Sequence, residues 1–177
     1  ININDLLGRE AIELNNPKVA ALISDRIVLV TGAAGSIGSG LAKSIAPLHP
    51  RKLILLDQAE TPLFELEQQL KAKFPKLVAE YVIGDICAAQ RMEKLFEVFN
   101  PEMVFHAAAY KHVPLMEDNP VEAIRNNIGG TLLLAQLAAK FAVKKFVMIS
   151  TDKAVNPTNV MGASKRVAEH VIQAENR

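Results

Sequence analysis

The chain has 177 residues, half of them hydrophobic, so it is long enough and apolar enough for one ordered domain with its own core. Its formal net charge is +1, and no run of Lys or Arg is interleaved with aromatic residues, so neither nucleic acid nor an acidic membrane surface is predicted as a partner. The only cysteine, Cys87, excludes an intrachain disulfide and fits a reducing compartment.

No membrane span or signal peptide is predicted in this sequence. Its apolar runs are shorter than the roughly 20 residues that cross a bilayer, and its first residues lack the basic and apolar regions of a signal peptide. The chain begins without Met, and Glu175–Arg177 continue a helical pattern with neither Gly nor Pro to end it. We therefore expect a soluble piece of a longer polypeptide.

Short β-branched runs alternate with longer segments of helical period along the chain. The predicted strands are almost continuously apolar, as strands covered on both faces require: Ile27–Thr31, Lys52–Asp57, Val78–Gly84, Met103–Ala107 and Lys145–Ser150. The predicted helices lie between and after them: Ser36–Ala46, Thr61–Phe74, Ala88–Phe99, Pro120–Phe141 and Val160–Asn176. This alternation predicts an α/β fold with a doubly wound parallel sheet (Rossmann fold) in three α/β/α layers.

The residues before the first strand have a separate pattern. Asn16 followed by Pro17 is typical of an N-cap and a first helical position, which predicts a short helix through Ile23. We therefore expect a linker with a short helix over residues 1–25, followed by one α/β domain over residues 26–177.

A glycine turn joins the first predicted strand to the helix that follows it. Gly32, Gly35 and Gly38 come directly after the strand, with Ser36 and Ile37 between the last two. Such a turn lets backbone N–H groups approach a pyrophosphate at the N-terminus of a helix. The context of strand, turn and helix predicts a dinucleotide site.

Asp57 ends the second predicted strand about 20 residues after the last glycine, which is the interval of the dinucleotide-binding fingerprint. Its carboxylate can accept hydrogen bonds from the adenosine ribose diol and would repel a 2′-phosphate, so NAD is favoured over NADP. Capping of the next helix is the structural alternative for Asp57. Asp85, after the third strand, either contacts adenine or caps the helix that starts near Ala88.

Motifs across most of the chain resemble the extended short-chain dehydrogenase/reductase superfamily of nucleotide-sugar enzymes. These motifs are Thr31-Gly-x-x-Gly-x-x-Gly38, Gly84-Asp85-Ile86, His106-Ala-Ala-Ala109, Asn127-Ile-Gly-Gly-Thr131 and Lys165. A second set is similar to the CapD-like polysaccharide-biosynthesis proteins, UDP-N-acetylglucosamine 4,6-dehydratases. That set comprises Asp5-Leu-Leu-Gly-Arg9, His106-Ala-Ala-Ala-Tyr-Lys-His-Val-Pro114, Ser150-Thr-Asp-Lys-Ala-Val155 and Asn156-Pro-Thr-Asn-Val-Met-Gly162.

The motifs and the resemblance together define the candidate site, with NAD as cofactor, a UDP-sugar as substrate and no metal. The predicted cofactor contacts are Gly32, Gly35, Ser36, Ile37, Gly38, Asp57, Asp85, Ile86, Ala107, Ala108, Ala109, Lys111, Asn127 and Lys165. The predicted catalytic residues are Thr151, Asp152, Lys153, Met161 and Lys165. Ligands of a Rossmann sheet collect beyond the carboxyl ends of the strands, where Ala107–Lys111 and Ser150–Lys153 both lie.

The resemblance implies oxidation of the sugar at C4, elimination of water across C5 and C6, and return of the hydride to C6. Elimination needs a base at C5 and an acid at the departing C6 hydroxyl. By similarity Asp152 is the acid and Lys153 the base, if burial and mutual contact shift their pKa values. The alternative for this pair is an exposed turn.

Met161 occupies the position where the superfamily carries its acid/base tyrosine, and a thioether cannot transfer a proton. Thr151 is the nearest polar candidate, as a relay of the C4 hydroxyl proton. Lys165 is four residues after Met161 and therefore on the same helical face, where a cation can hold the nicotinamide ribose. A solvated helix lysine is its alternative, and a cofactor-binding protein without catalysis is the alternative for Met161.

Several other polar residues have a structural interpretation or stay open between a structural and a functional role. His106 ends an apolar strand, which favours a buried, hydrogen-bonded histidine over a catalytic one. Asn127 lies inside a predicted helix and is expected to bond the strand region beneath the cofactor. For Lys111 and His112 the sequence does not choose between site and surface, and Glu117-Asp118-Asn119-Pro120 is interpreted as a helix start.

Two other function classes stay open from sequence. A UDP-sugar 4-epimerase shares the oxidation at C4 but does not need the Asp-Lys pair, and a non-catalytic dinucleotide-binding module is compatible with Met161. Family members carry a carboxy-terminal region that binds the UDP-sugar, so we expect this chain alone mainly to bind NAD. Larger members are membrane-attached, which implies a cytoplasmic domain of an inner-membrane protein, with a homo-oligomer as one expected state.

Overall fold

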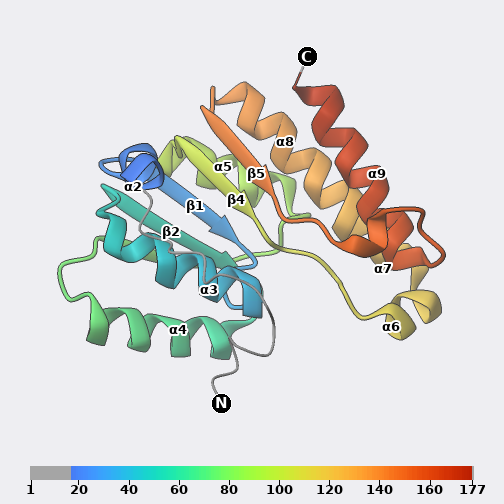
Figure 1. Ribbon diagram of the computed structural model, residues 1–177, viewed down its shortest axis with the longest axis horizontal. Coiled ribbons are helices and arrows are strands. Elements are labelled where there is room, and N and C mark those ends of the chain that lie inside the picture. Colours follow the sequence, from blue (N-terminus) through green and yellow to red (C-terminus); the bar gives the residue numbers. More distant parts are fainter. Residues whose placement is uncertain (1–16, 177) are drawn as a thin grey trace.

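The computed structural model describes residues 17–176 (Figure 1). The expected cap Asn16, the Asp5–Arg9 motif and the first 16 residues of the expected linker and helix over residues 1–25 lie outside the described residues. Five strands form one sheet in the order β3-β2-β1-β4-β5, with every neighbouring pair parallel. The strands are β1 (Ile27–Thr31), β2 (Lys52–Asp57), β3 (Ala79–Ile83), β4 (Met103–His106) and β5 (Lys145–Met148). The predicted parallel Rossmann sheet is confirmed.

Helices connect the strands and cover both faces of the sheet (Figure 1). The α-helices are α2 (Pro17–Ile23), α3 (Ser36–Ile45), α4 (Glu60–Lys73), α5 (Ala89–Phe99), α6 (Val113–Asp118), α7 (Pro120–Ala123), α8 (Thr131–Lys140) and α9 (Val160–Glu175). Two 3₁₀ turns, η1 (Ala46–Leu48) and η3 (Asp152–Ala154), and one π-helix, η2 (Ile124–Gly130), complete the described elements. No helix within residues 17–176 combines the length and apolar character that a bilayer crossing requires.

Alternate residues of the central strands point to two separate cores. Val28 and Val30 of β1 pack with apolar residues of α2, α3 and α4, whereas Leu29 packs with those of α5 and α8. Because successive side chains of a strand point to opposite faces, a strand covered on both sides must be apolar, as β1 and β2 are apart from their end residues Thr31, Lys52 and Asp57. The two cores fix three layers, and their common sheet provides the rigid edge on which the site is built.

The chain crosses the sheet between β3 and β4, so β1 lies between β2 and β4. Thr31 at the end of β1 is opposite Leu56 of β2 and His106 of β4, which brings three carboxyl ends to one edge. A reversal of strand order leaves a crevice outside the carboxyl ends of the strands. The loops that follow β1, β2, β4 and β5 therefore converge on one cleft.

The predicted bounds of most elements are confirmed to within one or two residues, but the helix predicted over Pro120–Phe141 is wrong as one continuous α-helix. It divides into α7, η2 and α8. The helix start predicted from Glu117-Asp118-Asn119-Pro120 is confirmed, since α7 begins at Pro120 with Asn119 as its N-cap. Glu117 and Asp118 are not part of this helix, because they end α6. Glu117 instead accepts a hydrogen bond at 2.6 Å from the backbone N–H of Val160, at the start of α9.

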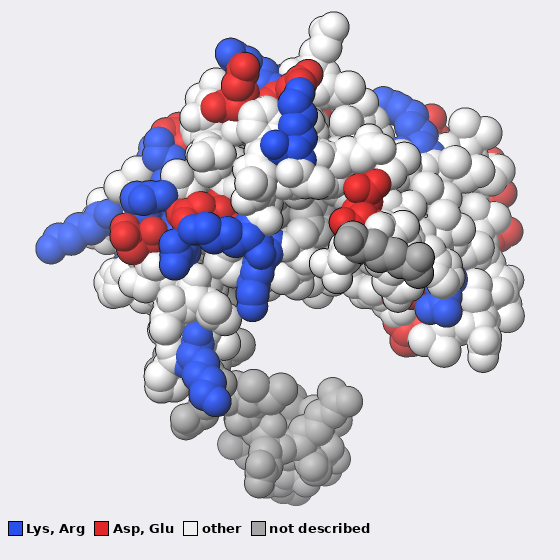
Figure 2. Space-filling model, turned by 90° about the horizontal axis from the view of Figure 1, so that it is seen from above, with Lys and Arg blue, Asp and Glu red and all other residues white. Residues whose placement is uncertain are grey.

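Charged side chains of both signs are interspersed on the surface, and Figure 2 shows blue and red atoms side by side on one face. Several are helix pairs three or four residues apart, such as Lys94 with Glu97 and Lys71 with Glu67. Exposed pairs of this kind contribute little, about 0–1 kcal/mol each. The arrangement agrees with the net charge of +1.

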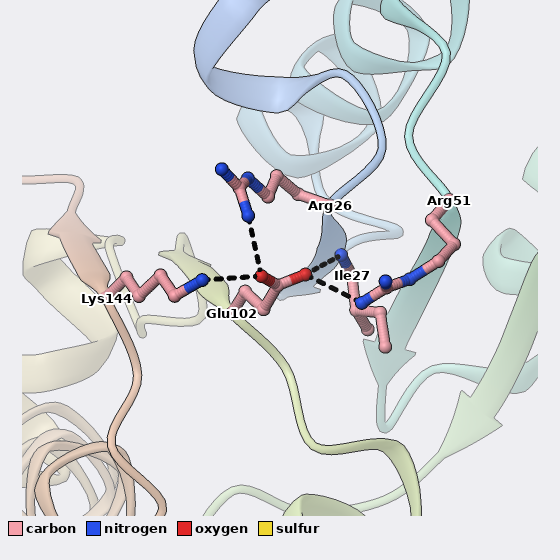
Figure 3. Close-up of polar contacts among 5 residues, drawn as sticks. All are labelled: Arg26, Ile27, Arg51, Glu102 and Lys144. Carbon is pink, nitrogen blue, oxygen red and sulfur yellow. Dashed lines mark hydrogen bonds and ion pairs between the residues drawn. The ribbon is translucent and has the colours of Figure 1, made fainter.

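Glu102 differs from these surface pairs because it joins four strands at their amino ends (Figure 3). Its carboxylate accepts from Lys144 at 2.9 Å, Arg26 at 3.0 Å, Arg51 at 2.9 Å and the backbone N–H of Ile27 at 3.2 Å. These contacts, led by the one from Lys144, hold the pKa of Glu102 at about 2. Only 16% of its side chain is exposed, so the network is screened less than an exposed pair.

Loss of the Glu102 charge should make the protein less stable, and the effect should depend on pH. A carboxyl whose pKa is lowered by folding contributes stability above its unfolded pKa and loses it as the pH falls toward the folded value. We expect Glu102→Gln to cost about 1–3 kcal/mol at pH 7 and to flatten the loss of stability between pH 5 and pH 2. Urea unfolding across this range measures both. Glu97→Gln is the matched control, and an equal response of the two variants would contradict the assignment.

Candidate active site

Two adjacent cavities lie along the carboxyl edge of the sheet. The first, here the glycine-loop pocket, measures about 240 Å³ and is lined by Gly32, Ala34, Gly35, Leu56, Asp57, Gln58, Ala59, Gly84, Asp85, Ile86, Ala107, Ala108, Ala109, Tyr110 and Asn126. The second, here the lysine pocket, measures about 260 Å³ and is lined by Ile37, Ala107, Ala109, Tyr110, Lys111, Ile149, Ser150, Thr151, Lys153, Met161 and Lys165. Three residues, Ala107, Ala109 and Tyr110, line both pockets, so together the cavities form one elongated site.

Close backbone contacts build the glycine turn between β1 and α3. Gly32 has φ +65°, and a Cβ there would lie 2.6 Å from the backbone of Ala108. A Cβ on Gly38 would lie 1.9 Å from the carbonyl oxygen of Gly32. At Gly35, by contrast, the nearest atom to a Cβ is the Gly32 oxygen at 3.3 Å, and the residue is exposed. Gly32 and Gly38 thus pack the turn, while Gly35 leaves room for a ligand to approach the start of α3.

Asp57 joins the glycine turn to the start of α4 while it lines the glycine-loop pocket. Its Oδ2 accepts from the backbone N–H of Ala34 and its Oδ1 from that of Ala59, both at 2.9 Å. Ala59 is the N-cap of α4 and no side chain caps this helix, so Asp57 forms a turn before α4 and the capping alternative is wrong. A carboxylate has about four lone-pair sites, so these two bonds leave acceptor capacity for a ligand.

Asp85 is committed largely to the protein. Its Oδ1 accepts from the backbone N–H of Cys87 at 2.8 Å, and its Oδ2 pairs with Arg125 at 2.7 Å. The bond to Cys87 forms a turn before α5, but no side chain caps that helix, so the capping alternative is wrong for Asp85. Ile86 is almost fully buried and forms part of the wall of the glycine-loop pocket.

The loop after β4 is fastened across the cleft. Lys111 Nζ donates to Ser36 Oγ at the start of α3 at 3.3 Å, and Gln58 donates to the Tyr110 hydroxyl at 3.4 Å. Lys111 lines the lysine pocket, so the structure places it at the site rather than on a remote surface. Tyr110 and Gln58 line the cleft without having been predicted, because their motif positions carry no chemical signature of their own.

The π-helix η2 brings Asn126 and Asn127 to the site together, both buried. Asn127 accepts from the Tyr110 N–H at 2.8 Å and donates to the Tyr110 carbonyl at 3.0 Å and to Ser164 Oγ at 2.9 Å. The Asn126 side chain also donates to Asn127 Oδ1. Together these bonds use all four hydrogen-bonding positions of the Asn127 carboxamide. The Asn127 side chain therefore has no free donor or acceptor for the expected direct contact with the cofactor. It instead fixes the loop after β4 to α9. A wider helical turn is a common feature of functional sites.

His106 is a buried, hydrogen-bonded histidine, as predicted. Its Nδ1 lies 2.7 Å from Thr31 Oγ1 and its Nε2 lies 2.9 Å from Thr131 Oγ1. Thr131 donates its own proton to the Asn127 carbonyl at 2.6 Å, so it can only accept from His106. Burial, followed by the charge of Lys165, lowers the pKa of His106 to about 3, which keeps the ring neutral.

Met161 and Lys165 lie one turn apart on α9 and both line the lysine pocket. Met161 is 3% exposed and packs with Met116 and Ala123, so it fills the pocket wall. Lys165 is 5% exposed and its Nζ donates to the Ile149 carbonyl at 2.7 Å. Burial lowers the pKa of Lys165, and Glu169 opposes that effect. The alternative of a solvated helix lysine is therefore wrong for Lys165.

Thr151, Asp152 and Lys153 follow β5 and enter the 3₁₀ turn η3. Thr151 Oγ1 donates to Asp152 Oδ1 at 2.9 Å, and Lys153 Nζ is 3.4 Å from the same oxygen. The mutual contact is therefore present, but the expected burial of the pair is wrong, because 87% of the Asp152 side chain and 49% of that of Lys153 are exposed. Hydrogen bonds from Thr151 and then Lys153 lower the pKa of Asp152.

The two pockets collect most of the predicted site residues but not all. Ser36, Gly38, Asn127 and Asp152 do not line either cavity. One supporting residue had a role that the sequence did not indicate: a Cβ on Gly162 would lie 2.2 Å from the Lys153 carbonyl oxygen. This glycine lets α9 approach η3 closely, and its place directly after Met161 in the motif was the available signal.

A family model described as a polysaccharide biosynthesis protein matches residues 28–177. The chain belongs to this family. It is 47% identical to the capsular polysaccharide biosynthesis protein CapD of Staphylococcus aureus, over 99% of this chain and 30% of CapD. It is 33% identical to an inverting UDP-N-acetylglucosamine 4,6-dehydratase of Campylobacter jejuni, over 88% of this chain and 45% of that enzyme. The chain thus spans less than half the length of either relative, and the resemblance to CapD-like extended dehydrogenase/reductases is confirmed.

Solved structures share the same architecture. Pen from Bacillus thuringiensis matches with a TM-score of 0.80 at 35% identity, over 86% of this chain and 46% of that one. WbmG from Bordetella bronchiseptica in complex with NAD matches with a TM-score of 0.72 at 25% identity, over 85% of this chain and 50% of WbmG. The UDP-glucose 4-epimerase of Thermotoga maritima with UDP-glucose matches with a TM-score of 0.74 at 26% identity, over 85% of this chain and 51% of the epimerase.

Proposed function

We propose that this chain is the dinucleotide-binding part of an NAD-dependent UDP-N-acetylglucosamine 4,6-dehydratase. The observation that carries the proposal is the hydrogen-bonded Thr151-Asp152-Lys153 segment at the rim of a pocket that also holds Lys165 and Met161. Elimination of water needs an acid and a base close together, and this segment provides both groups. The C. jejuni relative, which is named as such a dehydratase, supports the assignment.

The glycine-loop pocket fits the adenosine and pyrophosphate of a dinucleotide. The room left at Gly35 opens onto the start of α3, where no side chain caps the first N–H groups, so they are free to receive a phosphate. Asp57 has acceptor capacity for a ribose diol. When bound, NAD supplies an acceptor and donor of hydride. WbmG, whose structure contains NAD, supports this choice of cofactor.

The Thr151–Asp152 hydrogen bond suggests a route for the first proton. As the C4 hydroxyl is oxidised, Thr151 accepts its proton and passes its own along the 2.9 Å hydrogen bond to Asp152. A protonated Asp152 is the acid that the departing C6 hydroxyl then needs. Lys153 is the base that takes the C5 proton. This route removes the need for a titratable group at Met161 and for an Asp152 pKa that is raised in the free protein.

The complete protein should be incubated with UDP-N-acetylglucosamine in deuterated water and its product followed by NMR. The proposal expects a 4-keto-6-deoxy sugar that carries deuterium at C5, because the C5 proton exchanges with solvent during elimination. A product that keeps its C6 hydroxyl would contradict the dehydratase assignment. Binding of NAD without any substrate-dependent reduction would instead support a non-catalytic module.

A UDP-sugar 4-epimerase is the second candidate function. The observation in its favour is the exposure of Asp152, which lies outside the lysine pocket and would not be required for epimerisation. The T. maritima epimerase supports this candidate through its fold. Under this alternative Asp152→Asn would leave turnover nearly unchanged, and the product would be a C4 epimer that keeps its C6 hydroxyl.

Binding of NAD(H) should be tighter than binding of NADP(H), and Asp57 should cause the difference. We expect Asp57→Ala to reduce the preference by about 1–3 kcal/mol, since it deletes a charged hydrogen-bond acceptor and the repulsion of a 2′-phosphate. Calorimetric titration with both cofactors measures the difference in their binding free energies. Gln58→Ala is the control, because Gln58 lines the same pocket without charge. Equal affinity of the unaltered chain for both cofactors would remove Asp57 from this role.

A further inference from the structure

Two residues of α9, one turn apart, hold two consecutive residues of the segment that leaves β5. Lys165 Nζ donates to the Ile149 carbonyl oxygen at 2.7 Å, and Ser150 Oγ donates to Glu169 Oε1 at 2.6 Å. The next residue is Thr151, the first of the segment that carries the proposed acid and base. The start of that segment is thus attached to α9 at two points.

The lysine pocket has an excess of positive charge. Lys111 enters from the loop after β4, Lys153 from η3 and Lys165 from α9, and none of the described residues that line the pocket is acidic. His106, which interacts with Lys165 from β4 below, is neutral. Asp152 lies outside the pocket against Lys153. An opposite charge close to a buried ammonium favours its protonated form.

Glu169 supplies that charge. It follows Lys165 by four residues on the same helical face, where side chains are neighbours. Burial lowers the pKa of Lys165, and Glu169 acts against this shift. The carboxylate is held ionised in turn, because the hydrogen bond from Ser150, and then the pair with Arg166, lower the pKa of Glu169.

We propose that Glu169 is a positioning residue of the lysine pocket: through Ser150 it holds the start of the Thr151–Lys153 segment, and as the counter-charge to Lys165 it keeps that lysine protonated. The catalytic part of this inference rests on the proposed function. The electrostatic part concerns Lys165 in the free protein and stands without it.

Two variants separate the charge of Glu169 from its attachment to Ser150. Glu169→Gln removes the charge but keeps an amide oxygen that can accept from Ser150. Ser150→Ala removes the hydrogen bond and keeps the carboxylate. Arg166→Gln is the matched control, because it deletes the other partner of Glu169, a 3.0 Å pair in which the Arg166 side chain is 46% exposed.

The titration of Lys165 tests the charge directly and requires no substrate. With lysines labelled at Cε, NMR of the complete protein should show Lys165 losing its proton roughly 1 pH unit lower in Glu169→Gln than in the parent, with little change in Arg166→Gln. Lys165→Arg identifies the resonance. The sign follows because removal of a nearby negative charge favours the neutral amine. An unchanged Lys165 titration in Glu169→Gln would overturn the electrostatic part.

Turnover tests the attachment. In Glu169→Gln the alkaline limb of the turnover profile should move to lower pH with the Lys165 titration. In Ser150→Ala the rate should fall roughly tenfold at every pH with no displacement of that limb, since only the position of Thr151–Lys153 changes. If both variants merely lowered the thermal midpoint, Glu169 would be a structural residue and the proposal wrong. If the parent protein formed no dehydrated product, the proposed function would fail, and the Lys165 titration would decide the role of Glu169.

Discussion

Replacing Lys153 with Ala, or Asp152 with Asn, in the complete protein should lower the rate of dehydration by roughly 10²–10⁴-fold, the usual size of a general acid or base contribution. Lys153→Ala removes the proposed base for the C5 proton, and Asp152→Asn removes the carboxylate that Thr151 contacts at 2.9 Å. NAD affinity should be nearly unchanged, because Asp152 lies outside both pockets and Lys153 borders only the lysine pocket. Single-turnover kinetics and calorimetry measure the two quantities separately.

Variants at Met161 and Thr151 serve as comparisons for these reductions in the rate of dehydration. Met161→Leu should have a small effect, because Met161 is buried among apolar side chains and transfers no proton. The loss of rate in Thr151→Val should lie between these extremes, since this variant keeps the volume and deletes the hydroxyl of the proposed proton relay. Near-normal dehydration in both Lys153→Ala and Asp152→Asn would make the elimination mechanism untenable and favour the epimerase.

The sheet was predictable because its strands satisfy a simple requirement. A strand covered by helices on both faces must be apolar at every position, and β1 and β2 were predicted to the residue. The glycine turn was predictable for a similar local reason, since Gly32 at φ +65° and Gly38 against the Gly32 carbonyl leave no room for a side chain. Both signals lie within a few consecutive residues.

The π-helix could not be predicted from periodicity. Helical period fits the sequence from Pro120 to Phe141 well enough to predict one α-helix, but two adjacent buried asparagines do not fit a single face of it. Their burial depends on Tyr110 and Ser164, which belong to other elements. A wider turn that exists to satisfy distant partners leaves little trace in the local pattern.

The protonation states of the site were the least predictable part. The pattern brought Asp152 and Lys153 together correctly, yet their burial was overestimated, because exposure depends on which segments cover the end of β5. Lys165, by contrast, is buried, and its partners could not be predicted. Its position four residues after Met161 indicated a shared face, but the carbonyl of Ile149 and the charge of Glu169 appear only in three dimensions.

Gly38→Ala should abolish useful dinucleotide binding, whereas Gly40→Ala, two residues later in the same helix, should leave it unchanged. A Cβ on Gly38 would lie 1.9 Å from the Gly32 carbonyl oxygen and 2.9 Å from the Cα of Ala33, so α3 must move away from the turn. These are backbone atoms, which cannot yield as a flexible side chain would. The movement displaces the start of α3 from the position in which its free N–H groups meet the pyrophosphate.

We expect the NAD affinity of Gly38→Ala to fall at least ~100-fold, because overpacking strain of a few kcal/mol corresponds to a loss of this size. A Cβ on Gly40 meets nothing within 4 Å, so Gly40→Ala should instead raise stability by about 0.5–1 kcal/mol through helix propensity. Calorimetric titration with NAD and urea unfolding of both variants measure the two effects. If Gly38→Ala bound NAD as tightly as Gly40→Ala, close packing of the glycine turn would not be what holds the cofactor, and the pyrophosphate would have to be assigned to another part of the cleft.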